Sequence, residues 1–392
     1  MCHLKTNALE ILLPEAFVGE TLAYSPYVTR EHSFNLRPSS HSSAPALRAK
    51  LIDPRIEGEW DHAVAEYPHA TIFHTSAWAN VLCDTYGHAP HYFSLSQGEK
   101  RVALVPMMEV KSAFTGCRGV CLPFSDFCGP LISGESSLAT SILDRLSGLA
   151  RERAWKYFEV RAALPSGVAV PARDSFHGHR LSLTKSPDDL FKGFASSVRR
   201  AIRKAERSAL SVEVTSESGA IPRFYRLHNQ TRRRHGIPPQ PLSFFQNIHA
   251  HVIKRGLGFL VIAHLDARPI AAGVFFHFGR QALFKFGASD DRYQEYRANN
   301  LVMWEGIKHA AQLGAETLHL GRTDLGHAGL RRFKLSLGAE EEMLHYFRFD
   351  ATNARWMNKS PQKPSSLPGA VFRSLPLTVN RLAGTVLYPH LH

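Results

Sequence analysis

The sequence predicts an α/β protein made of two domains. The chain has 392 residues, of which 44% are hydrophobic and 21% are charged, a composition typical of globular proteins. This length leaves room for two domains of ordinary size, each with its own core. Between residues 186 and 350 the apolar pattern changes between helical and strand periods, in the order α-α-β-β-β-α-β-α-β. This alternation predicts the α/β (α+β) class.

Composition divides the chain into four segments. Residues 1–47 are rich in Ser, Pro and His without periodicity, which predicts a mostly disordered leader. Residues 48–185 and 186–350 are the two predicted domains. Residues 351–392 form a Pro-rich linker and a tail, in which the apolar segment Val371 to Leu387 carries two arginines. That segment predicts a docking or membrane-surface helix, or one that packs back on the domain.

In the first predicted domain, short apolar runs are separated by turn residues. Ser76 is a candidate N-cap for a helix that ends near Asp84. The stretch Thr115 to Pro130 contains several Gly and Pro residues and predicts turns. The remaining predicted elements are strands at His91 to Leu95, Arg101 to Glu109 and Tyr157 to Arg161, and a helix at Leu138 to Arg153.

The second predicted domain begins with a capping motif. Ser186 precedes Pro187 at the first helical position and an acid, Asp189, at the third. One helix follows, and its apolar stripe extends to Ala209. A helix pair between Ala220 and Arg255 is interrupted by residues 236–241, which include three prolines. Three strands then follow, at Phe259 to His264, Pro269 to His277 and Ala282 to Ala288.

The most informative stretch runs from Asn299 to Lys334. It predicts a helix capped by Asn299 and Asn300, a strand from Thr317 to Leu320, a glycine loop and a basic helix. On the last helix, the stripe Leu330, Phe333 and Leu337 is predicted to be buried, with Arg331 and Lys334 facing a cleft. Charged residues at strand ends and helix N-termini are typical of ligand sites in α/β folds.

Charge and cysteine usage limit the possible partners. The net charge of +13 favours an anionic partner, such as a nucleotide-bearing substrate, tRNA or the acidic inner leaflet. Five cysteines without a C-x-x-C pair predict buried, reduced thiols and no metal site.

The sequence has no apolar run long enough to span a membrane, and its N-terminus is a poor secretory signal. We therefore expect a cytoplasmic protein, with peripheral contact at the inner face of the membrane as an option. No Walker loop, H-E-x-x-H or G-x-S-x-G motif occurs.

A series of short motifs resembles the FemAB family and the related BioF2-like acetyltransferase domain of the GNAT superfamily. Together the motifs cover roughly residues 50 to 350, and the tail is similar to that of FemAB-like proteins found with exosortase and exopolysaccharide systems. The motifs are Ile72 to Trp78, Leu122 to Pro130, Val198 to Ala205, Gly236 to Pro241, Gly287 to Asp290, Gly321-Arg322, Phe333-Lys334 and Gly338 to Glu340.

The resemblance implies two tandem GNAT-like (acyl-CoA N-acyltransferase) domains and transfer of an acyl or aminoacyl group to an amine. The implied donor is acyl-CoA, an acyl carrier protein or aminoacyl-tRNA, with no tightly bound cofactor. The implied acceptor is an amine on a cell-envelope, peptidoglycan or exopolysaccharide precursor. In such a fold the donor inserts where the fourth strand, here Ala282 to Ala288, splays from the fifth, here Thr317 to Leu320.

On this resemblance, the loop from Ser289 to Ala298 occupies the pyrophosphate position. It has arginines but no glycine, unlike the usual acetyl-CoA loop. This departure puts CoA in doubt and suits a family whose known donors include aminoacyl-tRNA. The alternative is an ordinary polar surface loop. The predicted donor-binding residues are Ser289, Arg292, Arg297, Asn299, Asn300 and Arg331.

The resemblance also implies a catalytic group. Lys334 matches a lysine at the transfer site, where an ammonium stabilises the oxyanion of the attacked carbonyl. Asp324 and Arg322 follow the fifth strand, and Asp324 is predicted to orient or deprotonate the acceptor amine. The alternatives are a solvated lysine and a loop-capping aspartate. We expect Lys334→Ala to leave folding nearly unchanged, with Arg332 facing solvent.

Two basic stretches are predicted to bind substrate phosphates. Arg200, Arg203 and Lys204, together with Arg207, lie on one helical face, and residues 232–234 are three consecutive arginines. The alternative is a solvated charged face. Two rival functions remain: a non-catalytic scaffold that has lost donor binding, and direct binding of nucleic acid driven by the net charge.

Overall fold

A computed structural model describes residues 47–133, 138–162, 170–358 and 367–391. The predicted leader lies outside these residues, apart from Leu47. Among the described residues, no helix is both long and apolar enough to cross a bilayer.

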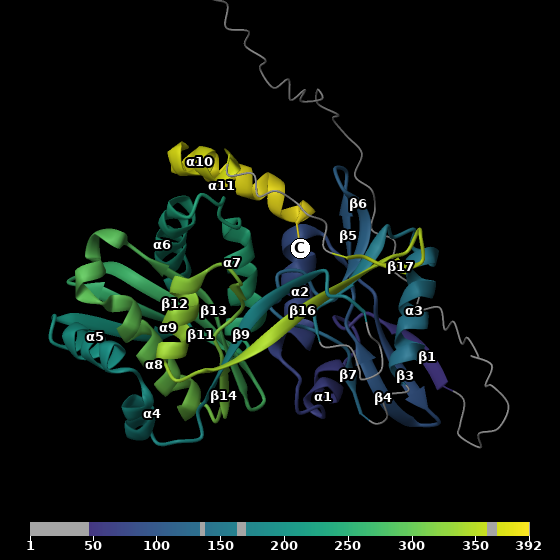
Figure 1. Ribbon diagram of the computed structural model, residues 1–392, viewed down its shortest axis with the longest axis horizontal. Helices are drawn as coiled ribbons and strands as arrows, with labels where there is room; N and C mark the ends of the chain where they lie inside the picture. Colours follow the sequence, from purple (N-terminus) through teal and green to yellow (C-terminus); the bar gives the residue numbers. More distant parts are fainter. Residues whose placement is uncertain (1–46, 134–137, 163–169, 359–366, 392) are drawn as a thin grey trace, which may run out of the picture. The chain divides into compact units, whose positions relative to one another are not determined.

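In its described residues, the first half of the chain contributes strands to two sheets and has three α-helices (Figure 1). Its elements are β1 (Leu47–Ile52), α1 (Trp60–Ala65), η1 (Ile72–His74), α2 (Ser76–Tyr86), β2 (Ala89–Pro90), β3 (Tyr92–Gln97), β4 (Lys100–Val105), β5 (Met108–Ser112), β6 (Gly116–Val120), β7 (Leu131–Ile132), α3 (Leu138–Glu152) and β8 (Tyr157–Val160).

The second half continues the larger sheet and adds helices on both of its faces. Its elements are β9 (Asp174–Ser182), α4 (Pro187–Gly193), α5 (Ser196–Glu206), β10 (Leu210–Thr215), α6 (Ala220–Arg234), α7 (Leu242–Ile248), η2 (His249–Ile253), β11 (Gly258–Leu265), β12 (Arg268–Phe278), β13 (Gln281–Ser289), η3 (Asp291–Tyr296), α8 (Ala298–Gln312), β14 (Thr317–His319), β15 (Thr323–Asp324), α9 (Ala328–Ser336), β16 (Glu340–Asp350), β17 (Arg355–Trp356), α10 (Leu367–Ser374), α11 (Leu377–Leu387) and η4 (Tyr388–His390).

Most elements lie where the sequence predicts them, but four predictions were wrong. Ser76 is the first residue of α2 rather than its N-cap, a position that Thr75 takes. The strand predicted from Arg101 to Glu109 is split at Pro106, which has no N–H to donate to a sheet. The helix predicted to extend to Ala209 is interrupted because Phe194 and Ala195 are extended. Phe194 turns inward there, and its ring lies 5.4 Å from that of Trp304.

The fourth wrong prediction concerns how α8 begins. Asn299 and Asn300 lie inside its first turn rather than at its cap. Arg297 takes the cap position with a φ of 59°, in the left-handed region, and provides no side-chain capping bond. The first turn of α8 therefore keeps N–H groups that its cap residue does not satisfy.

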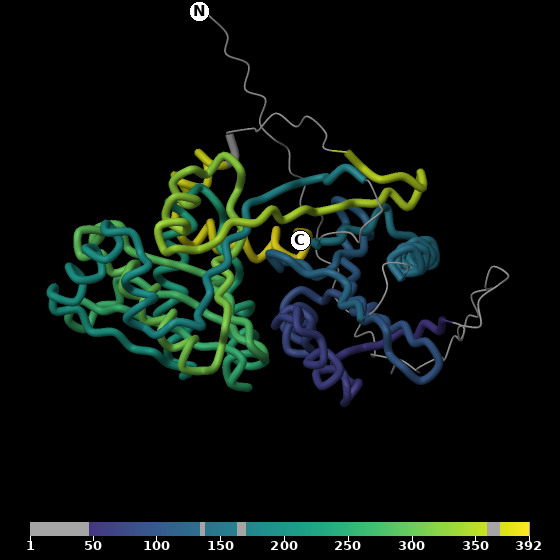
Figure 2. Tube along the Cα trace, turned by 60° about the horizontal axis from the view of Figure 1, so that its bottom comes forward, coloured from purple at the N-terminus to yellow at the C-terminus, as the bar shows by residue number. Residues whose placement is uncertain are grey.

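Two strands connect the predicted domains through one sheet. The larger sheet has the order β10-β11-β12-β13-β14-β9-β16-β8-β6-β5-β2, and β1-β3-β4-β7 form the smaller one. The strand β16 pairs with β9 through Glu340 to Tyr346, and then with β8 through Phe347 to Asp350 (Figure 2). Strands from both sides of the predicted boundary at residue 186 therefore share one hydrogen-bonded sheet.

Alternate residues of the central strands face two hydrophobic clusters. On β11, Val261 and Ala263 pack with α5 and α8, while Leu260 and Ile262 pack with α6, α7 and the core of the first half. Successive side chains of a strand point to opposite faces, and both faces of β11 are buried. Its sequence is therefore a nearly continuous apolar run.

The strands β13 and β14 separate after a short parallel pairing. Only Gln281 to Leu283 of β13 pair with β14, opposite Thr317 to His319. The next six residues of β13, up to Ser289, continue along β12 alone. The strands β13 and β14 are the fourth and fifth strands of the domain. The resemblance to the FemAB family implies that the donor inserts at this splay.

Candidate active site

A buried ion pair lies at the splay. Lys285 stands on β13 beyond the last residue paired with β14, and its Nζ lies 2.9 Å from Oδ2 of Asp126. The two side chains are only 7% and 13% exposed. The carboxylate also lies close to the end of β14, because a Cβ at Gly321 would come within 3.7 Å of that same oxygen. Asp126 thus brings a negative charge from the first half of the chain to this point.

The turn before Asp126 is held in an uncommon conformation. Leu122 and Phe124 have φ values of 56° and 59°, which non-glycine residues rarely adopt. Arg161 supports the turn by donating from Nη1 to the carbonyl oxygens of Leu122 and Ser125, at 3.2 and 2.9 Å. Backbone strain of this kind persists where the surroundings fix it, which is common at functional sites.

The surroundings keep Asp126 negatively charged. Burial alone would raise the pKa of its carboxyl group, but the positive charges of Lys285 and Arg322 outweigh burial and lower the pKa below its ordinary value. For Lys285, burial lowers the pKa, and the neighbouring Asp126 opposes that effect. The carboxylate is therefore suited to binding or orienting a cation.

Lys334 is buried next to this pair rather than exposed on its helix. Only 4% of Lys334 is accessible, and Nζ donates to the carbonyl oxygens of Gly321 and Arg322 at 2.7 and 3.1 Å. Burial is the main reason why its pKa falls from 10.5 to about 8. Lys285 lowers the pKa further, while Asp126 and Asp324 oppose the fall. The predicted stripe on α9 is corrected accordingly: Lys334 points inward, while Leu330 is 36% exposed.

Arg322 is linked to Asp126 through Tyr346. Although Arg322 reaches the surface, its guanidinium lies 4.5 Å from the ring centre of Phe176, and its Nη1 donates to the hydroxyl of Tyr346 at 3.1 Å. That hydroxyl in turn donates to the backbone carbonyl of Asp126 at 2.6 Å. Two buried lysines, Lys285 and Lys334, and the more accessible Arg322 thus gather around one carboxylate. We call these four residues the Asp126 cluster.

His319 fixes the turn that carries Gly321. Its Nδ1 accepts a hydrogen bond from the N–H of Gly321 at 2.9 Å, and its Nε2 lies 3.4 Å from a carboxylate oxygen of Glu342. Burial lowers the pKa of this imidazole despite the nearby carboxylate. A neutral ring whose Nδ1 accepts carries its proton on Nε2, toward Glu342.

Asp324 lies near the Asp126 cluster but outside it. It forms part of β15, which pairs with Phe176 and His177 of β9, and its side chain is exposed. Its charge is close enough to favour the ammonium form of Lys334. The predicted role of Asp324 toward the acceptor amine stays a prediction, with solvent access in its favour.

Four of the predicted donor-binding residues line one cavity. Ser289, Arg297, Asn299 and Asn300 surround a space of about 130 Å³ at the start of α8, together with Asp290 and Tyr293. Tyr293 also borders a second cavity of about 530 Å³, to which Arg226 and Arg268 contribute. We call the first space the α8 pocket. An uncapped helix start favours an anionic group there.

The other two predicted donor-binding residues, Arg292 and Arg331, are paired with carboxylates. Arg292 contacts Asp290 through two hydrogen bonds, and its side chain is 67% exposed. The Nε and Nη2 of Arg331 donate to the two carboxylate oxygens of Glu341, at 2.7 and 2.8 Å. These bonds join α9 to β16. Neither residue lines the α8 pocket, so the predicted six residues do not form one group.

The basic face of α5 is exposed, as its helical spacing predicts. Arg200, Arg203 and Lys204 all point to solvent, and within the described parts of the chain no salt bridge engages them. Arg203 also lies 5.4 Å from the ring centre of Phe191. By contrast, the arginines at 232–234 are engaged: their side chains bond to the tail and to the carbonyl of Ser289.

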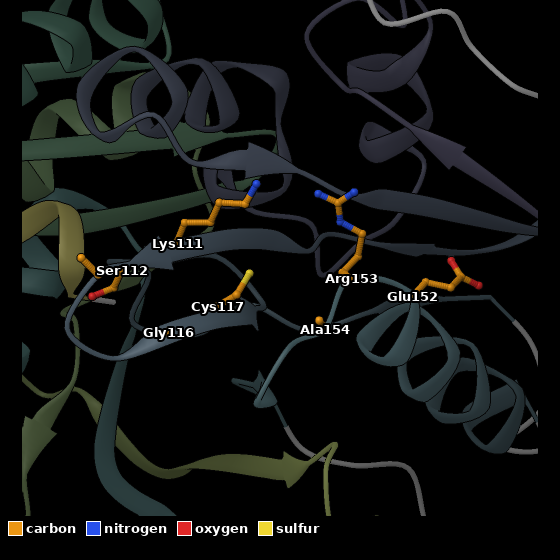
Figure 3. Close-up of a pocket in the computed structure, with 8 residues that line it drawn as sticks. Lys111, Ser112, Gly116, Cys117, Glu152, Arg153 and Ala154 are labelled. Atoms are coloured by element: carbon orange, nitrogen blue, oxygen red, sulfur yellow. The ribbon is translucent and has the colours of Figure 1, made fainter.

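Another cavity lies in the first half of the chain. It measures about 600 Å³ between the β5–β6 hairpin and the end of α3, with Lys111, Cys117 and Arg153 on its wall (Figure 3). None of the predicted site residues lines it. Among the residues that the structure describes, no cluster of His, Cys, Asp and Glu has the geometry to hold a metal ion.

Comparison with known proteins matches part of the chain to a known domain. Residues 192–335 match the model of the acetyltransferase (GNAT) domain. Over 146 residues the chain is 24% identical to the UDP-N-acetylmuramoylpentapeptide-lysine N(6)-alanyltransferase of Weissella viridescens, an alignment that covers 36% of this chain and 42% of that protein. The chain thus matches less than half the length of this curated relative.

Two solved structures share the fold. FemX superposes with a TM-score of 0.61 at 14% identity, over 76% of this chain and 96% of that one. L-PGS from Bacillus licheniformis gives a TM-score of 0.50, also at 14% identity, over 84% and 97% of the two chains. The second half of the chain therefore carries a GNAT domain. Over most of its length the chain shares the fold of FemX, and the predicted α/β fold of GNAT type is confirmed.

Sequence reasoning missed Asp126, Lys285, His319 and Tyr346. Asp126 lies inside the Leu122 to Pro130 motif on which part of the resemblance rests, but the motif itself gives it no partner. The pairing with Lys285 spans 159 positions. The available signal was a lone lysine within a strand whose neighbours are apolar, Leu283 to Phe286, because a charge in such a run needs a partner.

Proposed function

We propose that this protein is an N-acyltransferase that moves an acyl or aminoacyl group from an activated carbonyl donor to an amine. The observation that carries the proposal is the Asp126 cluster at the β13–β14 splay, where three cations surround one carboxylate. Fixed positive charge in a site of low dielectric constant stabilises an oxyanion far better than water-exposed charge does.

The chemical step requires no covalent enzyme intermediate. The neutral acceptor amine attacks the donor carbonyl, so that a C–N bond forms and negative charge moves to the carbonyl oxygen. The C–O or C–S bond to the donor then breaks, and the proton lost by the amine ends on the leaving oxygen or sulfur. Lys334 stabilises the oxyanion in this proposal, Arg322 contributes positive charge, and Asp324 orients the amine or removes its proton.

The buried lysine suits this role because it is still mainly protonated near neutral pH. With a pKa of about 8, Lys334 is mainly an ammonium at pH 7 and carries the positive charge that stabilises an oxyanion. Two of its three N–H groups are used by the carbonyls of Gly321 and Arg322. These bonds hold the ammonium in place before substrate arrives, which is the preorganisation that oxyanion stabilisation needs.

Among the possible donors, an aminoacyl ester of tRNA is the one we favour. The loop after β13 has no glycine through which backbone N–H groups could follow a pyrophosphate, and the α8 pocket is smaller than the roughly 300 Å³ or more of typical ligand sites. The exposed cations of α5, Arg200, Arg203 and Lys204, suit a long polyanion. Thioesters of CoA or of a carrier protein are the alternative donors.

The acceptor in this proposal is an amine on a precursor of the cell envelope, such as a peptidoglycan or exopolysaccharide building block. Support comes from the curated relative, whose name describes alanyl transfer to a lysine of such a precursor. The reaction would take place in the cytoplasm, where precursors and charged tRNA are both available.

The test is a transfer assay with the purified protein. Alanyl-, seryl- and glycyl-tRNA, acetyl-CoA and an acetylated carrier protein are each offered with UDP-N-acetylmuramoyl-pentapeptide. Mass spectrometry then follows the acceptor. The expected result is one added acyl or aminoacyl group that depends on Lys334. Absence of transfer from all of these donors to this and other amine-bearing glycan precursors would contradict the proposal.

A non-catalytic binding protein is the second candidate, because the Asp126–Lys285 pair occupies the splay that a donor would enter. Calorimetry separates the two functions. Tight binding of an acyl-CoA or of charged tRNA, weakened by Lys334→Ala, supports the enzyme. A protein that binds glycan precursors but none of the donors supports the scaffold.

A further inference from the structure

The helix α11 presents its apolar side chains to solvent and its small and polar ones to the protein. Asn380 and Gly384 are buried, and Tyr388 of η4 continues the same inward face one turn later. On the outward face, Val379, Leu382 and Val386 are 44%, 66% and 52% exposed. A surface helix ordinarily has the opposite arrangement, with apolar residues facing the core.

The inward contacts fix this orientation. The hydroxyl of Tyr388 accepts from Arg232 at 2.5 Å and donates to the carbonyl of Pro238 at 3.1 Å. A Cβ added to Gly384 would collide with the carbonyl oxygen of Pro239, so the helix lies directly on that backbone. Asn380 donates to the carbonyl of Phe372 at 2.7 Å, tying α11 to α10. Turning the apolar stripe inward would break all of these interactions.

An exposed aromatic residue continues the apolar surface. Phe114 lies at the tip of the β5–β6 hairpin and is 75% exposed, while its ring packs edge-on against His390 with centroids 4.8 Å apart. Leu391 is 45% exposed beside that histidine. We call Phe114, Val379, Leu382, Val386 and Leu391 the tail face. The described C-terminal helices and the first half of the chain both contribute to it (Figure 1).

The charged residues of the C-terminal segment itself are all basic. From Ala351 to the last residue of the printed sequence there is no Asp or Glu, whereas Arg373 and Arg381 of the two helices are exposed. The whole chain carries a net charge of +13. An apolar stripe with an aromatic residue and basic neighbours is the composition of helices that lie in the interface of a bilayer.

We propose that the tail face docks on an anionic lipid surface, with its apolar side chains among the acyl chains and Arg373 and Arg381 near lipid phosphates. Charge complementarity favours this occupant over a second copy of the chain, because two identical cationic faces repel one another. This inference goes beyond the transfer reaction and does not depend on it, since lipid binding requires neither donor nor acceptor.

The experiment measures partition of the full-length protein onto vesicles by sedimentation. One set contains phosphatidylcholine alone, and the other contains phosphatidylcholine with phosphatidylglycerol. We expect binding to the anionic vesicles, weakened by salt. The double variant Leu382→Ser/Val386→Ser should bind at least about ten-fold more weakly, because two apolar side chains no longer enter the acyl chains. Arg373→Gln should cost roughly five-fold on anionic vesicles alone.

Ile56→Ser is the matched control, because Ile56 is 69% exposed but lies between β1 and α1. It should bind vesicles like the unmodified protein, and all variants should keep their melting temperature. Unchanged vesicle binding by the double variant would overturn the proposal. So would a concentration-dependent dimer, seen by sedimentation velocity without vesicles, that the double variant abolishes while the protein binds no lipid.

Discussion

The basic face of α5 and the Asp126 cluster carry the same kinds of charge in opposite surroundings. Arg200, Arg203 and Lys204 stand in water without carboxylate partners among the described residues. Lys285 and Lys334 are buried, and each is held by an oxygen less than 3 Å away. A hydrated charge costs little to keep, whereas a buried one costs several kcal/mol unless it is paired.

The difference indicates what each group can do. Exposed charges act at a distance on a polyanion and are screened by salt. Buried charges act on one atom at close range, in a medium where the same charge has a larger effect. Substitutions should therefore separate the two groups: those in the Asp126 cluster should affect stability and turnover together, and those on the α5 face should affect donor affinity alone.

The largest effect is expected from Asp126→Asn. It leaves Lys285 buried without its carboxylate, which should lower the free energy of unfolding by about 3–5 kcal/mol. Urea denaturation measures the loss, and the transfer assay should show little remaining activity. The control is Asp144→Asn, an exposed carboxylate of α3, for which about 0.5 kcal/mol or less is expected.

A second variant tests the reason for that loss. Replacing both partners, as Asp126→Leu with Lys285→Met, removes the unpaired charge and should recover most of the stability but none of the activity. If the double variant is as unstable as Asp126→Asn alone, the turn geometry rather than the ion pair accounts for the loss.

Lys334→Ala comes next. Turnover should fall by roughly ten- to a thousand-fold, the scale of removing one oxyanion-stabilising group. The sequence suggested that folding would be unaffected, but the two hydrogen bonds to carbonyls now predict a loss of about 1–3 kcal/mol as well. Lys334→Arg should rescue turnover only in part, because its planar fork does not fit the position of an ammonium.

Arg332→Ala is the matched control for Lys334. It lies on the same helix, and its exposure agrees with the sequence prediction. Its effect on turnover and melting temperature should be small. Equal losses of turnover at both positions would mean that α9 contributes diffuse positive charge and that Lys334 has no special role.

These residues show how far local patterns reach. The helices and strands of the second half follow from periodicity because each pattern involves neighbours in sequence, as in α6 and β11. The burial of Lys334 does not follow, because its spacing on α9 is equally compatible with a cleft-facing side chain. The carbonyls that hold it belong to a turn twelve or thirteen positions earlier, whose path depends on β15 pairing with β9.

The site as a whole was only partly predictable for the same reason. Ser289, Arg297, Asn299 and Asn300 are close in sequence and meet in one pocket, whereas Arg331 was grouped with them by resemblance and lies on another element. Asp126 comes from the first half of the chain and meets β13 only through the three-dimensional fold. No period or spacing in either segment encodes that pairing.

The pH dependence of transfer tests the protonation state of Lys334. Because its pKa is about 8, the ammonium fraction falls as pH rises through that value. If the ammonium stabilises the transition state, kcat/KM should decline above about pH 8, and this limb should move to higher pH in Lys334→Arg. An activity that rises through pH 8 in the unmodified protein but not in Lys334→Arg would instead identify Lys334 as a base.

Stability should change in the opposite direction over the same range. The pKa of Lys334 is about 8 in the folded protein against an ordinary 10.5, so the unfolded chain binds more protons between these values. Its contribution to stability therefore rises with pH from about 8 to 10.5. The urea midpoint of Lys334→Met, compared with that of the unmodified protein across this range, measures the contribution.

The smallest effect on the fold is expected from neutralising the α5 face. Arg200→Gln, Arg203→Gln and Lys204→Gln together should change the free energy of unfolding by less than about 1.5 kcal/mol, since each is an exposed substitution worth roughly 0.5 kcal/mol or less. Turnover at saturating donor should be unchanged.

The affinity of the triple variant for a charged tRNA should fall. A plot of the logarithm of the affinity against the logarithm of the salt concentration should become shallower, by up to about 0.9 for each phosphate that the variant no longer neutralises. Lys100→Gln on β4, another exposed cation, serves as the control and should leave the salt slope unchanged. An unchanged slope in the triple variant would mean that another surface attracts the tRNA. The basic residues with a role in the reaction would then be those of the Asp126 cluster.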